Sequence, residues 1–347
     1  MKLLEKTGST HKSSIICMVY QGVLWASEPF QSIVDAHRLG EKAGRQAGDF
    51  LYATLNSSLS ITTSFAAGQS LYTVRNDIHN YIREMQRQNS LHNVRNLILV
   101  NSQCLVLKEG VASLEDADGV PSESDFPPDK LSLLVTKIHN TARAYLFRQL
   151  DNESLDINVS GTILDEKHQL RPLFFMGIFF EGLACFQLAR QTNNDEGTKW
   201  MERGESILVR MKLWSQHSTW NFENKMLLLE AEKMHTLGIF DRAATFYDGA
   251  IRSAREHKFI HEEAIASELA GVLYYERRIH QKALNFLMHS IRSYEKWGAL
   301  AVAKRVETFI ASIYGEDFKQ LGLNEDALSY IFASSNKNAL KKRQGTE

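Results

Sequence analysis

Proline is scarce in this sequence of 347 residues. There are five prolines, and three of them (Pro121, Pro127 and Pro128) fall in one short stretch. A proline inside a helix costs roughly 3 kcal/mol, so long proline-free spans favour long helices. The sequence also has no strand-rich region that could form a nucleotide-binding sheet.

Cysteine and net charge are also low. The three cysteines, Cys17, Cys104 and Cys185, are odd in number, far apart and surrounded by apolar residues. This pattern favours buried thiols in a reducing compartment, so we predict a cytoplasmic location. The 40 basic and 41 acidic side chains leave a formal net charge of −1. Such a balance creates no general attraction for nucleic acid or an anionic membrane, and we expect neither as a partner.

Long hydrophobic runs are absent as well. Residues 15–26 are apolar and follow several lysines, as in a signal peptide, but Glu5 and Gln21 interrupt the pattern and favour a first helix of the fold. The run Leu173–Phe186 has 14 residues and contains Glu181. A membrane span needs about 20 apolar residues. We therefore predict a buried helix there and no membrane partner.

Catalytic motifs are missing too. Gly197-Thr-Lys199 lacks the glycine-rich turn of a phosphate loop, and no kinase catalytic loop or Gly-x-Ser-x-Gly elbow occurs. His261-Glu-Glu263 begins like a zinc-protease helix, but Ile265 stands where the second histidine belongs. We predict no catalytic residue, cofactor or metal. A helical enzyme stays open as an alternative, since catalytic partners meet only in the fold, and buried convergent His, Asp or Glu side chains would favour it.

Apolar residues follow helical spacing along most of the chain, with breaks at Gly48, Gly68 and Gly110. Residues 115–130 are acidic and proline-rich and predict a mobile loop; as a calcium loop the stretch has unsuitable residues at two ligand positions. The predicted segments are an N-terminal helix and turn (1–30), a first helical-repeat lobe (31–114), the acidic loop (115–130), a second lobe (131–314), and a C-terminal helix with a basic tail (315–347).

An internal repeat occupies the C-terminal third. The run from Ala231 to Ala243 recurs forty residues later as the run from Gly271 to Ala283. Small residues fit where two helices cross closely, and glycine or a polar pair fits the turn. We predict the following repeat-packing residues: Ala231, Gly238, Ala243, Ala250, Gly271, Tyr274, Ala283, Trp297 and Gly298.

The pattern Gly238-x-Phe-x-x-Ala243, which also occurs as Gly48-x-Phe-x-x-Ala53, resembles the tetratricopeptide repeat. The period is about 40 residues here, where 34 is usual. The resemblance implies an all-α fold: a right-handed superhelix of antiparallel helical hairpins, each of which needs its neighbours to bury its apolar face.

A second resemblance is carried by Glu263–Gly271 (EAIASELAG), Ser293–Ala299 (SYEKWGA), Ala303–Glu307 (AKRVE) and Arg38–Ala53. These runs look like the helical repeat region of large AAA-type signalling ATPases and multi-sensor histidine kinases. The resemblance covers roughly residues 30–310. In that family a kinase-like module and an ATPase precede the repeats, and a GAF sensor with a histidine kinase or cyclase often follows. Neither part is recognisable here, so the chain resembles the helical module alone.

The predicted function is a non-catalytic scaffold or signal-relay module that mediates protein–protein interaction, with a protein or peptide in a concave groove. Helix phase gives the candidate groove residues, the polar positions Asn221, Asn224, Lys225, Ser267 and Glu268. The alternative is a regulatory segment of a larger ATPase or kinase whose catalytic modules lie outside this chain.

Overall fold

The computed structural model describes residues 11–87, 94–110, 121, 129–150, 158–165, 171–192 and 195–314. Within these ranges the regular elements are fourteen α-helices and one short 3-10 turn, without a strand, which confirms the all-α class. In chain order they are α2 (Lys12–Gly22), η1 (Leu24–Ala26), α3 (Phe30–Ala47), α4 (Phe50–Ala66), α5 (Leu71–Arg87), α6 (Val94–Glu109), α7 (Lys130–Leu146), α8 (Val159–Asp165), α9 (Pro172–Gln191), α10 (Asp195–His217), α11 (Thr219–Thr236), α12 (Phe240–Glu256), α13 (Ile260–Glu276), α14 (His280–Trp297) and α15 (Leu300–Tyr314).

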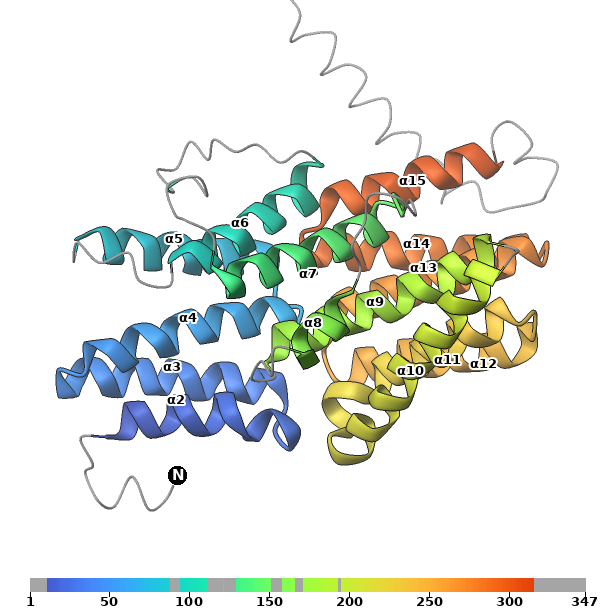
Figure 1. Cartoon of the computed structure of the whole chain (residues 1–347). Helices are drawn as coiled ribbons and strands as arrows, with labels where there is room; N and C mark the ends of the chain where they lie inside the picture. The colour runs from blue at the N-terminus through green and yellow to red at the C-terminus, as the bar shows by residue number, and fades with distance from the viewer. Residues whose placement is uncertain are drawn as a thin grey trace, which may run out of the picture.

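Most helices pack against the next one along the chain, as Figure 1 shows. At one end α2, α3 and α4 lie together, and at the other α10, α11 and α12 do. Helix α9 runs between these groups and contacts both α4 and α10. Segments distant in sequence also meet, because α15 packs on α6 as well as on α14.

Short turns with one left-handed residue connect many of the helices. At the turn between α11 and α12, the Gly238 N–H donates to the His235 carbonyl (3.0 Å) and the Ile239 N–H donates to the Met234 carbonyl (2.9 Å). This is the Schellman arrangement, which satisfies carbonyls left over at a helix end. Positive φ angles occur at Gly48 (75°), Gly238 (71°), Lys258 (64°), Arg278 (57°) and Gly298 (98°).

The helix boundaries agree with the predicted breaks at Gly48, Gly68 and Gly110, each of which follows a helix. Within the predicted second lobe, Val159–Asp165 forms α8, a short helix that the sequence pattern does not reveal. Most of the predicted acidic loop and the whole C-terminal segment 315–347 lie outside the described residues.

One connected apolar core extends from Phe30 to Tyr314. Its central element is α9, whose Pro172 occupies the first turn, where a missing N–H costs no hydrogen bond. Among the described residues, α9 alone is long and apolar enough to cross a membrane, and 94% of its most apolar window is buried inside the fold. The position of α9 agrees with the predicted buried helix. The boundary between two lobes stays a prediction.

The predicted repeat-packing residues lie between helices or at turns. Gly271 faces α14 so closely that an added Cβ would lie 2.6 Å from the Leu287 Cγ. Tyr274 stacks on Phe286 with ring centroids 5.4 Å apart, and Trp297 is buried at the end of α14. Gly238 and Gly298 form the turns described above. The alanines of the set, Ala231, Ala243, Ala250 and Ala283, are all buried.

Candidate functional site

The five polar residues predicted to line a groove are buried, which corrects that prediction. Asn221, Asn224 and Lys225 lie in the first half of α11, and Ser267 and Glu268 lie in α13. Their exposed fractions range from 0% to 3%. Neighbouring helices cover them, so none is available to a partner in the described structure.

Asn221 connects the start of α11 to the start of α3. Its Nδ2 donates to the carbonyls of Trp25 (3.3 Å) and Glu28 (2.7 Å), and its Oδ1 accepts from the Phe30 N–H (2.9 Å). These bonds satisfy backbone groups that a helix start would otherwise leave unpaired. Asn221 therefore connects, through hydrogen bonds, two segments that lie about 190 residues apart in the sequence.

Lys225 and Glu262 form a fully buried ion pair between α11 and α13. The Lys225 Nζ donates to the Glu262 Oε2 (2.9 Å) and to the Asn221 carbonyl (2.8 Å), and it lies 4.0 Å from the centroid of the Phe259 ring. Asn224 donates to the same Glu262 oxygen. Burial lowers the pKa of Lys225 and raises the pKa of Glu262, because both charges have left water.

His261 is buried beside this pair, and within the described residues neither of its ring nitrogens has a hydrogen-bond partner. Its Nε2 lies 3.5 Å from the Glu262 Oε1, and its ring packs against that of Trp297 with centroids 5.2 Å apart. Burial, with the Lys225 charge as a second cause, lowers the pKa of His261 to about 3. The imidazole is therefore neutral at physiological pH.

Glu268 joins three helices and the turn after α7. Its Oε1 accepts from the Arg148 Nη2 (2.5 Å), and its Oε2 accepts from the Arg305 Nη2 (2.6 Å) and the Tyr294 hydroxyl (2.9 Å). Burial opposes ionisation, but Arg148 and Arg305 outweigh it and lower the pKa of Glu268 to about 2. The carboxylate is thus held ionised.

A similar cluster surrounds Glu232 in α11. Its carboxylate pairs with the Arg190 Nη2 (2.9 Å) and accepts from the Tyr247 hydroxyl. His235 contacts both the Tyr247 hydroxyl (Nδ1, 3.2 Å) and the Glu276 carboxylate (Nε2, 2.7 Å). Burial is the largest influence on the Glu232 carboxyl, yet Arg190 and His235 keep its pKa below the ordinary value.

These clusters meet one condition of the helical-enzyme alternative, because buried His and Glu side chains converge. None of His261, Glu262, Glu232 or Glu268, however, lines the three best-formed cavities in the described part of the chain. A general acid or base must reach its substrate. The described residues also contain no group of three or more His, Cys, Asp or Glu side chains placed to hold a metal ion. The ion pairs and hydrogen bonds of these clusters therefore stabilise the packing between neighbouring helices.

An exposed apolar stripe runs along the outer face of α2. It consists of Ile15, Met18 and Val19 of α2 and of Val23, which directly follows the helix; these residues are 37%, 60%, 39% and 65% exposed. The opposite face of α2 buries Ile16 and Cys17 against the fold. In Figure 1 this helix lies at the edge of the molecule, beside α3. The stripe, which the sequence prediction did not include, repeats the spacing of a packed helix face.

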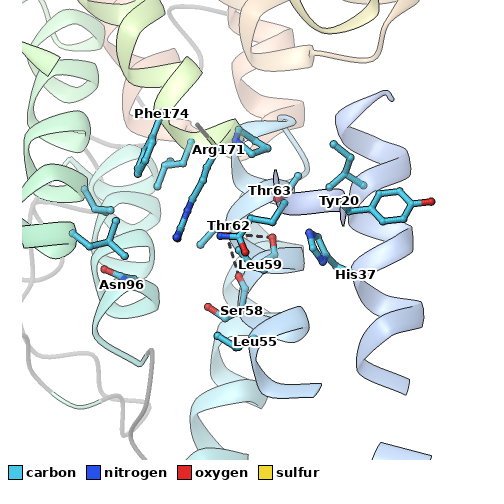
Figure 2. A pocket seen from close by; sticks show the side chains of 16 residues that line it. Tyr20, His37, Leu55, Ser58, Leu59, Thr62, Thr63, Asn96, Arg171 and Phe174 are labelled. Atoms are coloured by element: carbon cyan, nitrogen blue, oxygen red, sulfur yellow. Dashed lines mark hydrogen bonds between the residues drawn. The ribbon is translucent and has the colours of Figure 1, made fainter. Parts of the chain in front are cut away.

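A cavity of about 190 Å³ opens where six helices meet (Figure 2). Its single formal charge is Arg171, which precedes α9 and extends into the space between α4 and the Asn96 side of the cavity. His37 also lines it; burial lowers the pKa of His37, so this ring is neutral. The other lining residues are Tyr20, Gln21, Ile33, Leu55, Ser58, Leu59, Thr62, Thr63, Leu131, Val135, Pro172, Leu173 and Phe174.

No protein-family model matches the chain, and a comparison with curated proteins finds no significant match. The resemblance to the repeat region of signalling ATPases therefore remains a prediction. What the chain does has to be argued from the geometry above.

Proposed function

We propose that this chain is a non-catalytic helical-repeat scaffold that holds a protein partner on the outer face of α2. The observation that carries the proposal is the stripe of Ile15, Met18, Val19 and Val23, whose exposed apolar face adjoins a packed one. Contiguous exposed apolar residues on a folded surface mark interaction sites. We propose this surface as the binding site instead of the predicted groove, because the five polar residues predicted to line the groove are buried.

The repeat architecture supports the scaffold. Left-handed turn residues follow each other at intervals of 20 residues, at Gly238, Lys258, Arg278 and Gly298. Two helices and two turns thus fill about 40 residues, a spacing that supports the proposed period. We propose that these hairpins are stacked as a right-handed, tetratricopeptide-like superhelix, in which each hairpin covers the apolar face of its neighbour.

The chemistry of the stripe favours an amphipathic helix as the partner segment. Ile15, Met18 and Val19 lie at i, i+3 and i+4 along α2, and Val23 directly follows the end of the helix, so the four side chains form one exposed apolar ridge. A partner helix with apolar residues at the same spacing would pack on that ridge as α2 itself packs on α3. The partner then continues the stacking of the array by one helix.

The double variant Met18→Glu/Val23→Glu tests the proposal. Each carboxylate would stand on the ridge where the partner's apolar residues must lie, so co-purification of the partner from native cells should be lost. A matched control, Arg252→Glu/Arg292→Glu, changes exposed side chains on α12 and α14 and should leave co-purification unchanged. Unchanged co-purification with the α2 variant, when both variants retain wild-type circular dichroism, would contradict the proposal.

A regulatory segment of a larger ATPase or kinase is the second candidate. It is favoured by the runs at Glu263–Gly271 and Ser293–Ala299, which fall in the tightly packed pair α13 and α14. Reading the coding sequence beyond both ends of this chain tests it. A phosphate-loop ATPase upstream, or a GAF–kinase pair downstream, is the expected result, and a stop codon on both sides is the contrary one.

The predicted cytoplasmic location is retained as part of the proposal. Cys17, Cys104 and Cys185 are all free and buried. Burial raises the pKa of each thiol, in the case of Cys104 to about 12, so these thiols stay protonated and unreactive. Free buried thiols of this kind suit a reducing compartment.

A further inference from the structure

The cavity of Figure 2 contains a cation without an anion. Arg171 makes no ion pair with any carboxylate in the described part of the chain, and Asp, Glu and Lys are absent from the residues that line the cavity. Its one polar partner is neutral: with the Gln21 amide oxygen turned toward it, Arg171 donates from Nη2 (3.1 Å) and Nε (3.0 Å). Its guanidinium carbon also lies 5.9 Å from the centroid of the Phe174 ring.

The surroundings of Arg171 differ from those of three other half-buried arginines in the helix core. Arg148, Arg190 and Arg203 each contact a buried glutamate, at 2.5, 2.9 and 2.6 Å respectively. Burial lowers the pKa of Arg171, because desolvation disfavours its charge and no neighbouring carboxylate offsets that cost. Arginine nevertheless stays protonated in proteins. An anion in the cavity would supply the missing counter-charge.

Other polar groups in the cavity are also free to bind a ligand. The Asn96 side-chain oxygen is buried and makes no hydrogen bond among the described residues. The Ser58 hydroxyl likewise has no partner there, whereas the Thr62 hydroxyl already donates to backbone carbonyls of its own helix. His37 contributes no charge, because burial lowers its pKa; its Nδ1–H donates to the Asn56 Oδ1 (2.8 Å), and Nε2 of the neutral ring is an acceptor.

The remaining walls are apolar, and they set the size and character of the ligand. Leu59, Val135 and Phe174 lie among eight apolar residues that line the cavity. Its volume of about 190 Å³ exceeds that of an apolar cavity known to hold benzene, roughly 150 Å³. Leu55, Leu59 and Arg171 are only half-buried, so the cavity can be reached from solvent.

We propose that this cavity binds a small monocarboxylate with an apolar body, whose carboxylate pairs with Arg171 and whose body lies against Leu59, Val135 and Phe174. Arginine recognises a carboxylate through two parallel N–H donors. One cation suits one negative charge, and the apolar walls disfavour a strongly hydrated phosphate. The site is separate from the α2 stripe, so it can be tested without reference to the partner.

Isothermal titration calorimetry on the full chain tests this with four probes: benzoate, hexanoate, benzamide and inorganic phosphate. Benzoate or hexanoate should bind with one site per chain. Benzamide, which has the ring but no charge, should bind at the same site at least about tenfold more weakly, since it offers Arg171 one neutral carbonyl oxygen in place of two charged carboxylate oxygens. No binding of either carboxylate, equal binding of benzamide, or preferred binding of phosphate would each overturn the proposal.

Three variants locate the site. Arg171→Gln removes the charge, and Leu59→Trp fills the apolar part while Arg171 remains; each should weaken binding of the carboxylate probe about tenfold or more. The matched control, Arg252→Gln on the exposed face of α12, should bind like the wild type. If Arg171→Gln does not fold, Leu59→Trp decides. Wild-type affinity in any folded cavity variant places the probe elsewhere and overturns the assignment.

Discussion

Replacing Glu268 with glutamine removes the charge that holds two arginines inside the fold. The variant keeps the size of the side chain and one carbonyl oxygen, but Arg148 and Arg305 lose their shared counter-charge. The pKa of Glu268 is about 2 where the ordinary value is 4.5. At about 1.4 kcal/mol per pH unit, the ionised carboxylate contributes about 3 kcal/mol to stability at neutral pH. Removing one partner of a buried ion pair typically costs roughly 3–5 kcal/mol, which agrees in size.

Urea unfolding followed by circular dichroism at pH 7 measures this loss. Glu202→Gln, on the exposed face of α10, is the matched control and should change the free energy of unfolding by less than about 0.5 kcal/mol. Because the pKa of Glu268 is lowered on folding, its contribution is complete above pH 4.5 and disappears as the pH falls toward 2. The wild type and the Glu268→Gln variant should therefore converge in their free energies of unfolding over that range. A variant as stable as the control at pH 7 would refute the reasoning.

Three further predictions concern single positions. The pKa values of His139 and His261 are about 3 where 6.5 is ordinary, so between these pH values the unfolded chain binds more protons than the folded one. The free energy of unfolding should therefore fall as the pH drops from 6.5 toward 3. His261→Phe should make that fall less steep, which urea unfolding at several pH values would measure. Gly271→Ala should lower the free energy of unfolding by about 1–3 kcal/mol through overpacking, and so lower the thermal midpoint. Gly249→Ala, whose Cβ meets only ordinary contacts, should raise the free energy of unfolding by about 0.5–1 kcal/mol, and so raise the midpoint. A lower midpoint for both variants would contradict the packing account. Arg278→Gly should stabilise the chain by about 1 kcal/mol in chemical unfolding, because its φ of 57° suits glycine, and destabilisation would show that its side chain matters more than its backbone.

Local sequence signals determine much of this fold. Gly48, Gly238 and Gly298 mark helix ends because a left-handed residue is needed there, and glycine adopts that conformation without a steric cost. The apolar run that begins at Pro172 indicates a buried helix since its side chains are apolar on most faces. The turns at Lys258 and Arg278 carry no glycine, and they can be located only by comparison with the glycine turns 20 residues away.

The functional surfaces could not be predicted in the same way. Asn221 and Glu268 have the polar character of exposed residues, but their partners, Phe30 and Arg148, come from segments more than 100 residues away. Helix phase cannot reveal such pairing and predicts exposure for both residues, which the fold buries. The cavity around Arg171 is assembled from six helices, and the sequence gives no sign of it beyond an arginine at the start of an apolar helix.

The central claim is that a partner protein packs on the outer face of α2. Site-specific photo-crosslinking in native cells tests it directly, with a photoreactive residue placed at Met18 and, in a separate protein, at the exposed position Arg292 of α14. The account predicts a crosslink from position 18 to one protein, through residues of an amphipathic helix, and none from position 292. A crosslink from position 292 alone, or none from position 18, would contradict it.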